Sequence, residues 1–247
     1  MNPTPGSEQQ IRPTAADRPF TFACHPGVAC FTECCRELDL ALTPYDVLRL
    51  KRSLGLSSGQ FLERYVIVEW EEPQLLPTCY LTMVDDGRAS CVFVCATGCT
   101  VYPDRPGSCR AYPIGRGAAR TGQGAPVESL VEVREPHCRG FAEECTQSVA
   151  DYLRGQGLDL YNRYNDALLP LVQHPSIQDG SFRPNRMQLD QYMLALYDLD
   201  QFRRQMVDGR IALNRPLTPA QLRGLAGDDE ELLLLAVRWL MQEYFGA

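Results

Sequence analysis

The stretch Cys30–Asp46, CFTECCRELDLALTPYD, places three cysteines within six residues and then runs directly into a helix start. Two of these cysteines, Cys34 and Cys35, are adjacent. Neighbouring side chains diverge, so these two thiols are not expected to chelate one ion together. We expect them to point to opposite sides, where each joins a different metal or one binds while the other packs. The stretch therefore indicates one half of a divided metal site.

The helix that follows has clear boundaries in the sequence. Thr43 is suited to the N-cap, Pro44 to the first helical position and Asp46 to the third, where a carboxylate favours the positive helix end. One face is then apolar, formed by Val47, Leu50 and Leu54. Gly55 suits the C-terminal stop. A second capping box, at residues 57–60, predicts another short helix directly after it.

All eleven cysteines of this 247-residue chain lie between Cys24 and Cys145. An odd number cannot all pair as disulfides, and buried hydrophobic cysteines would be scattered along the whole chain. The polar, proline-rich first residues, MNPTPGSEQQIRPTAADRP, contain no apolar secretion signal, so we expect a cytoplasmic protein with reduced thiols. The clustering therefore favours metal or redox chemistry over disulfide bonding.

Charge and hydropathy exclude other classes of function. The net charge of −7 is unfavourable for sequence-independent binding to nucleic acid, which depends on basic surface. The most hydrophobic stretch, residues 232–241, contains Arg238 and is far too short to span a bilayer. We therefore expect a soluble chain without nucleic-acid or membrane partners.

The pattern along the chain predicts an α+β fold. We expect a flexible tail at 1–19, a cysteine-cluster metal-binding domain at 20–157 and a helical C-terminal extension at 158–247. The middle domain should be a metal-stapled, loop-rich region with short helices and a small antiparallel sheet. Its strands are predicted at TCYLTMV and ASCVFV, which flank the turn DDGR, and at VESLVEV. The Gly- and Pro-rich residues 95–116 are predicted to be mostly irregular loop.

The rest of the chain has helical periodicity. Helices are predicted at about 146–154, 158–173, 187–207, 218–225 and 229–245. An apolar stripe lies within the third of them and is expected to be helix-packing core; it comprises Tyr192, Leu196, Leu199 and Phe202. Capping boxes at residues 218–221 and 228–231 mark the starts of the last two.

The cysteine spacings match no standard metal motif. The first cluster is Cys24-x5-Cys30-x3-Cys34-Cys35, and the second is Cys91-x3-Cys95-x3-Cys99-x9-Cys109, with Cys138 further on. Neither contains the C-x2-C knuckle of zinc ribbons or a ferredoxin run. A zinc or iron–sulfur site needs about four thiolates, so the clusters are expected to share ligands. Cys99, Cys109 and Cys138 are the predicted partners of the first cluster.

Three segments together resemble one known family. FACHPGVACFTECCRELDLALTPYDVLRLK, GCTVYPDRPGSCRAYP and CRGF are similar in order and spacing to the YkgJ-type cysteine-cluster family, a CxxCxxCC-like zinc- or iron-chelating domain. The resemblance spans residues 20–157, and the helical remainder is similar to an extension found in bacterial members. It implies eight metal ligands: Cys24, Cys30, Cys34, Cys35, Cys91, Cys99, Cys109 and Cys138.

The resemblance leaves several alternatives open. Cys79, Cys95 and Cys145 lie outside the pattern and are expected to be bystanders. Eight thiols could build two four-ligand sites, or one site with additional structural thiols. The metal could be zinc or iron, the latter including an iron–sulfur cluster, and either His25 or His137 could replace a thiolate.

Arginine directly follows cysteine at three positions. Arg36, Arg110 and Arg139 come after Cys35, Cys109 and Cys138. Guanidinium groups can offset the negative charge of a thiolate-rich site and lower thiol pKa values. These arginines are therefore candidates for charge compensation, with ordinary surface arginine as the alternative.

The function predicted on these grounds is a cysteine-cluster protein that holds iron, an iron–sulfur cluster or zinc in its thiolates. A second hypothesis is a protein lysine methylase that uses S-adenosylmethionine, because flagellin lysine methylases carry a similar cluster. The chain has no glycine-rich strand-to-helix loop of the Rossmann kind to support it. A third hypothesis is a structural zinc module for protein contacts. The sequence indicates no reaction, substrate, protein partner or oligomeric state.

Overall fold

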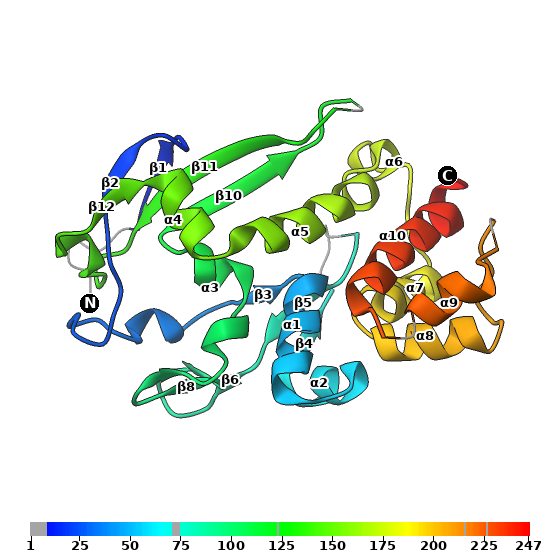
Figure 1. Cartoon of the computed structure of the whole chain (residues 1–247), viewed down its shortest axis with the longest axis horizontal. Coiled ribbons are helices and arrows are strands. Elements are labelled where there is room, and N and C mark those ends of the chain that lie inside the picture. The colour runs from blue at the N-terminus through cyan, green and yellow to red at the C-terminus, as the bar shows by residue number, and fades with distance from the viewer. Residues whose placement is uncertain (1–8, 71–74, 123, 215, 226) are drawn as a thin grey trace. The chain divides into compact units, whose positions relative to one another are not determined.

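The computed structural model describes residues 9–70, 75–122, 124–214, 216–225 and 227–247. Internal contacts divide the chain into two compact units. Unit 1 consists of Met1–Asp39 and Met83–Tyr161, and unit 2 consists of Leu40–Thr82 and Asn162–Ala247. Helices combine with several small antiparallel sheets, so the predicted α+β class is confirmed (Figure 1).

The principal sheet of unit 1 is antiparallel. The strand β11 (Val127–Arg134) pairs on one side with β1 (Gln10–Thr14) and on the other with β10 (Ile114–Ala119). The sequence placed residues 10–14 in a flexible tail, and the structure differs. Strand β1 is mostly exposed and is held by backbone pairing, which leaves no hydrophobic pattern in the sequence. The predicted strand at 127–133 is confirmed as β11.

A compact core lies beside this sheet. Strand β2 (Pro19–Thr21) pairs with β12 (Thr146–Ser148), which leads into α4 (Val149–Gly155). The core consists of Phe20, Phe22, Ile114, Leu130, Val149 and Tyr152. Aromatic rings meet within it, since the rings of Phe20 and Tyr152 contact edge to face with centroids 5.3 Å apart.

The cysteine-bearing segments of unit 1 contain little regular structure. They comprise the 3-10 turns η1 (Glu33–Cys35), η2 (Tyr102–Asp104) and η3 (Gly140–Ala142), the two-residue strands β6 (Met83–Val84), β7 (Ser90–Cys91), β8 (Val94–Cys95) and β9 (Gly98–Cys99), and the short helix α3 (Gly107–Ala111). Strands β6 and β7 form the hairpin predicted around DDGR, and Gly87 there has a φ of 76°. The remaining backbone is loop, as the sequence predicted.

Unit 2 begins with the two helices predicted from their caps. The helix α1 (Pro44–Leu54) has a reciprocal capping box between Thr43 and Asp46 and ends at Gly55 with φ 64°. The helix α2 (Ser58–Tyr65) is capped by Ser57 in the same way. They lead into a three-stranded sheet in the order β3 (Ala41–Leu42), β5 (Thr78–Leu81), β4 (Val66–Glu69).

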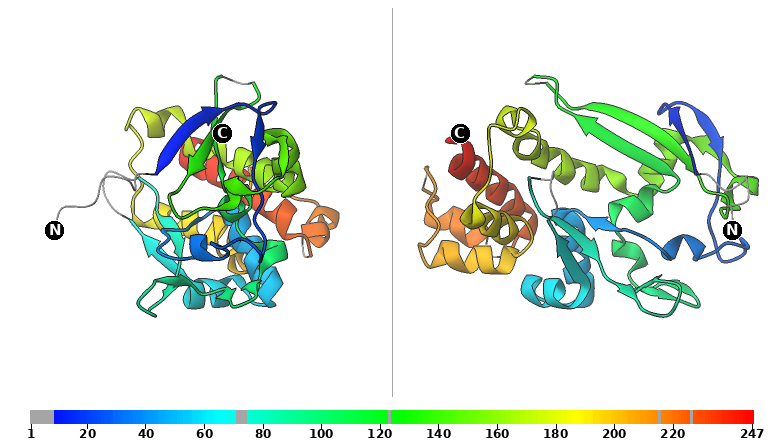
Figure 2. Two further views of the ribbon diagram at one scale, coloured as in Figure 1. Left: turned by 90° about the vertical axis from the view of Figure 1, so that its left-hand side faces the viewer. Right: turned by 180° about the vertical axis from the view of Figure 1, so that it is seen from behind.

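The C-terminal helices complete unit 2 (Figure 2). They are α5 (Leu158–Val172), α6 (Pro175–Gln178), α7 (Arg186–Leu196), α8 (Leu199–Val207), α9 (Pro219–Leu225) and α10 (Asp229–Phe245). The single helix predicted at 187–207 is wrong, because Asp198 accepts a hydrogen bond from the Gln201 amide at 3.3 Å and starts α8. The predicted apolar stripe is buried core, with α10 packed on α7 and α8.

The units alternate along the chain. Leu40–Thr82 groups with the C-terminal helices, because α1 and α2 pack on α10 and α8. The sequence assigned these residues to the cysteine-cluster domain, whose boundaries at 20–157 and 158–247 stay predictions. Within the described residues, no helix is long and apolar enough to cross a membrane.

Candidate metal centre

None of the eleven cysteines is in a disulfide, and every one except Cys79 lies in unit 1. Cys79 is fully buried in strand β5 of unit 2, and burial raises the pKa of its thiol to about 12. Its environment is that of a packed hydrophobic residue. The thiols of unit 1 form two neighbourhoods, which we call the first and second thiol groups.

The first thiol group consists of Cys24, Cys30, Cys34 and Cys138, with Cys35 beside it. Its members come from segments far apart in the sequence, and backbone pairing brings those segments together. The amide of Ala23 donates to the carbonyl of Gly140 at 3.0 Å, which places Cys24 next to the segment of Cys138. The amide of Arg139 donates to the sulfur of Cys30 at 3.0 Å. Three separate parts of the chain therefore meet at these thiols.

The close approach at Gly140 requires glycine. A Cβ atom there would lie 2.5 Å from the Phe22 ring and 2.6 Å from the Ala23 carbonyl oxygen. Contacts of that length are not tolerated by real Cβ atoms, and one of the two is to backbone. The glycine in HCRGF therefore permits the segment of Cys24 to lie against the turn of Cys138.

The electrostatics of the first thiol group favour the neutral form of Cys24, Cys34 and Cys138. Burial raises the pKa of Cys24 to about 11, and charge on Cys34, Cys30 and Cys138 would raise it further. Burial also raises the pKa of Cys138, although the Tyr112 hydroxyl opposes this. Cys24 and Cys138 are thus affected by neighbouring thiols, as expected for groups of like charge. A metal cation would compete with these protons.

The Cys35 thiol acts on its neighbour Cys34. This interaction, followed by burial, raises the pKa of Cys34 well above its usual range. The divergence of the two side chains stays a prediction. Both residues lie in the single 3-10 turn η1, whose N-cap Thr32 has a φ of 71°. A tight turn brings consecutive side chains closer than an extended strand would.

The second thiol group consists of Cys91, Cys95 and Cys99. Cys91 ends β7, and the hairpin β8–β9 carries the other two. Burial raises the pKa of Cys91 and of Cys99, and charge on Cys99 adds to the effect at Cys91. Cys95 is exposed, and its hydrogen bond with Thr97 at 3.2 Å lowers its pKa. Cys95, which the sequence set aside, therefore neighbours a predicted ligand.

The predicted partners of the first cluster are divided between these places. Cys138 lies in the first thiol group, Cys99 lies in the second, and Cys109 is exposed on α3. Cys145 is also exposed. The set of eight ligands implied by the resemblance stays a prediction.

Two of the three arginines next to the cysteines have other partners. The Arg110 guanidinium donates to the carbonyls of Arg105 at 3.0 Å, Gln156 at 2.8 Å and Pro103. It is buried and holds loop backbone together. Arg36 donates to the Thr32 carbonyl at 2.5 Å. Neither contact neutralises a thiolate.

Arg105 supplies the positive charge near the thiols instead. Its charge opposes the burial that raises the pKa of Cys24 and of Cys99, so it acts on both thiol groups. Its guanidinium is held over the Tyr102 ring at 3.9 Å and donates to the Tyr102 carbonyl at 2.7 Å. Arg105 does not adjoin a cysteine in the sequence, so the cysteine-arginine pattern could not identify it.

The two candidate histidines already have partners. The Nδ1 atom of His25 accepts a hydrogen bond from the Gly27 amide at 3.1 Å, and its Nε2 atom lies 3.1 Å from Glu143. The Nε2 atom of His137 lies 3.5 Å from Glu135. Ligation of a metal by His25 would require one of its two contacts to break.

The donor chemistry of the first thiol group fits zinc or iron. Four neighbouring thiols are the soft ligand set that both metals take in proteins. Among the described residues, no three His, Cys, Asp or Glu side chains are arranged to hold an ion. Binding would therefore draw these side chains together around the metal.

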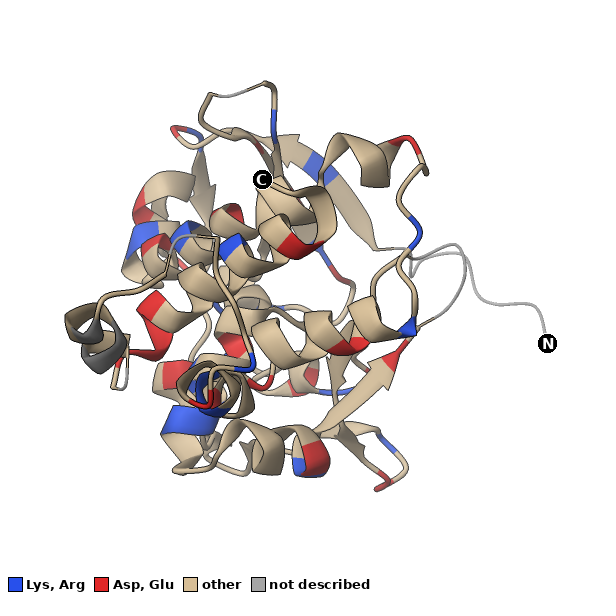
Figure 3. Cartoon of the chain, turned by 90° about the vertical axis from the view of Figure 1, so that its right-hand side faces the viewer, with Lys and Arg blue, Asp and Glu red and all other residues tan. Residues whose placement is uncertain are grey.

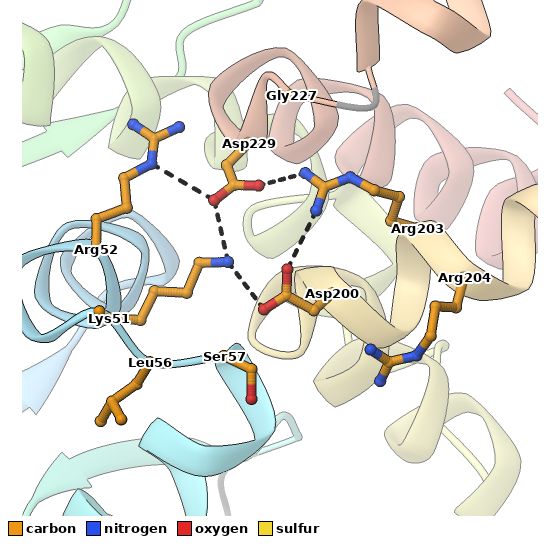
Figure 4. Close-up of a pocket in the computed structure, with 10 residues that line it drawn as sticks. Lys51, Arg52, Leu56, Ser57, Asp200, Arg203, Arg204, Gly227 and Asp229 are labelled. Atoms are coloured by element: carbon orange, nitrogen blue, oxygen red, sulfur yellow. Dashed lines mark hydrogen bonds and ion pairs between the residues drawn. The ribbon is translucent and has the colours of Figure 1, made fainter.

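Unit 2 contains a cavity of a different kind. Its volume is about 620 Å³, and it is lined by Lys51, Arg52, Gly55, Leu56, Ser57, Asp200, Arg203, Arg204, Gly227 and Asp229 (Figure 4). Lys51, the only lysine, points between Asp200 at 3.1 Å and Asp229 at 3.0 Å. Arg203 binds the other oxygens of both carboxylates.

This cavity is bordered by an internal ion network. Asp200 also accepts hydrogen bonds from the amide and hydroxyl of Ser58, at 2.7 and 3.0 Å. Burial alone would raise the pKa of both carboxyl groups. Hydrogen bonds from Ser58 and Lys51 hold the pKa of Asp200 below its usual value, and Arg203 and Lys51 do the same for Asp229. The arrangement joins α1, α2, α8 and α10. Acidic and basic residues lie close together on this side of the chain (Figure 3).

The gathering of ten cysteines in unit 1 thus fits the class of thiol-rich metal-chelating domains. Residues 23–145 match the model of the CxxCxxCC family, described as "Putative zinc- or iron-chelating domain". This cysteine-bearing segment belongs to that family, and the predicted resemblance is confirmed. All eight predicted ligands fall within the match. No curated protein and no solved structure matches the chain.

Proposed function

We propose that unit 1 binds zinc or iron through the first thiol group, with Cys24, Cys30, Cys34 and Cys138 as ligands. The observation that carries this proposal is the pairing of their segments: the Ala23 amide donates to the Gly140 carbonyl at 3.0 Å, and the Arg139 amide donates to the Cys30 sulfur at 3.0 Å. The charge of Cys34, Cys30 and Cys138 also raises the pKa of Cys24, which supports their proximity. The chelating character of the family supports a metal ion as the partner. When bound, the cation stabilises the thiolate form of its ligands.

Residues around the first thiol group have supporting roles in this proposal. The Arg139 amide, 3.0 Å from the Cys30 sulfur, would stabilise negative charge there. Arg105 would offset part of the charge of the thiolates. Gly140 would keep the segments of Cys24 and Cys138 in contact. In this proposal these groups orient ligands and balance charge.

The experiment is metal analysis of the full chain purified without air, together with its visible spectrum. We expect one equivalent of metal if only the first thiol group binds, and two if the eight predicted ligands form two sites. An iron–sulfur cluster would give a coloured protein, and zinc a colourless one. Colourless protein without stoichiometric metal would refute the proposal.

Single substitutions assign the ligands. Cys34→Ser and Cys138→Ser should each lower the metal content of the first site to a small fraction of the wild-type value. Cys145→Ser is the matched control, because this exposed cysteine lies outside the first thiol group. If the metal content survives both ligand changes, the first thiol group is not the site.

A structural zinc module is the second candidate, and the loop content of unit 1 favours it. Strands β6, β7, β8 and β9 each contain two residues, so backbone pairing alone gives these loops little support. A metal clip would supply stability that the loops lack. This candidate predicts a redox-silent ion whose removal by a chelator unfolds unit 1. A reversible redox transition of the bound metal would contradict it.

A further inference from the structure

A tyrosine hydroxyl is buried beside Cys138. Tyr112 follows helix α3, and its ring packs edge-on against the Phe22 ring with centroids 6.3 Å apart. Its carbonyl accepts a hydrogen bond from the Tyr152 hydroxyl at 2.5 Å. Because both the ring and the backbone are held by core residues, the direction of the Tyr112 hydroxyl is fixed by packing.

Among the described residues, the Tyr112 hydroxyl has no hydrogen-bond partner. It is also inaccessible to solvent. The side chains beside it are Cys138 and Glu135, which belong to one turn closed by the Cys138 amide and the Glu135 carbonyl at 3.0 Å. Native proteins rarely leave a buried donor unpaired, so this hydroxyl requires an explanation.

The chemical state of Cys138 supplies that explanation. A neutral thiol is a weak hydrogen-bond acceptor, whereas a thiolate is a strong one and forms a charge-assisted bond. Glu135 is already shared with His137, whose Nε2 atom lies 3.5 Å away. The acceptor that gains most strength on metal binding is therefore the sulfur of Cys138.

We propose that Tyr112 is a positioning residue for the metal centre, whose hydroxyl donates a hydrogen bond to the metal-bound thiolate of Cys138. This inference rests on the function proposed above. The metal-loaded state then satisfies a donor that the metal-free state leaves unpaired, which favours binding. Groups that orient a metal ligand in this way typically contribute about 10–100-fold to metal affinity.

The test is Tyr112→Phe in the full chain, with zinc affinity measured in competition with a chromophoric chelator. We expect zinc affinity about 10–100-fold lower and an unchanged number of sites. With Co²⁺ as the probe, the thiolate-to-cobalt absorption band should shift, because its donor sulfur loses a hydrogen bond. The metal-free variant should unfold at the same temperature as the wild type or higher, since phenylalanine removes only an unpaired donor.

Tyr161→Phe is the matched control. Its hydroxyl donates to the Arg105 carbonyl at 3.1 Å, so the variant loses a hydrogen bond that is satisfied. We expect it to unfold at a lower temperature without metal and to retain the wild-type cobalt band. A purely structural role for Tyr112 would make Tyr112→Phe behave in this same way.

The possible outcomes separate the two proposals. If the wild type binds zinc and Tyr112→Phe binds it within twofold with the same cobalt band, the role of Tyr112 is overturned while the metal site stands. If metal-free Tyr112→Phe is destabilised as much as Tyr161→Phe and its cobalt band is unchanged, the role is also overturned. If the wild type gives no cobalt band and no stoichiometric metal, both proposals fail.

Discussion

Replacement of the single lysine tests the interpretation of the ion network in unit 2. The Lys51 side chain is 5% exposed and contacts Asp200 at 3.1 Å and Asp229 at 3.0 Å. Lys51→Met keeps most of the packing but removes the cation. Loss of one partner from a buried ion pair costs about 3–5 kcal/mol. Arg203 still binds both carboxylates, so we expect the lower end, about 3 kcal/mol.

Urea unfolding followed by tryptophan fluorescence measures this loss. Both tryptophans, Trp70 and Trp239, belong to unit 2, and Trp239 is 4% exposed. Arg186→Met is the control, because its pair with Asp190 is 84% and 62% exposed and should contribute about 0.5 kcal/mol or less. If Lys51→Met loses less than about 1 kcal/mol, the network does not stabilise unit 2 as argued.

The remaining predictions concern pH, packing and capping. Because the folded-state pKa values of Asp200 and Asp229 are lowered, their contribution to stability should be present above about pH 4 and be lost as pH falls further, in acid titrations followed by fluorescence. Zinc affinity should rise with pH, by about tenfold per pH unit for each proton that binding releases. Protons should compete with zinc for the Cys24 sulfur up to about pH 11, and chelator competition at several pH values measures the effect. Gly140→Ala should weaken metal binding by forcing apart two segments of the first thiol group, measured by metal content. Asp198→Ala should lower the free energy of unfolding by about 1 kcal/mol in urea.

Local signals in the sequence predicted several elements well. The start of α1 followed from Thr43 and Pro44, and its end from Gly55, because capping depends on residues within a few positions. The turn at Gly87 was predicted for the same reason. Interruptions inside a periodic pattern were harder to detect. The apolar stripe continues through Asp198, and only the structure shows that this aspartate caps a new helix.

Long-range pairing could not be predicted from one sequence. Strand β1 carries little buried surface, so no apolar alternation marked Gln10–Thr14 as a strand. The cysteine spacing identified a metal-binding family but not the neighbours of each thiol. Arg105 and Tyr112 act near the thiols through contacts between distant segments, and neither lies in a pattern that points to that role.

The interleaving of the two units limits how the chain can be divided. Unit 1 is interrupted by Leu40–Thr82, and unit 2 begins with that segment and is completed only from Asn162 onward. No contiguous fragment contains one whole unit alone. During synthesis, Cys24 and Cys30 emerge about a hundred residues before Cys138, so in the proposed site these two thiols wait for Cys138. The proposed site would therefore be completed only after the first segment of unit 2 has been synthesised, and a truncation at residue 157 would leave α1 without the helices that bury it.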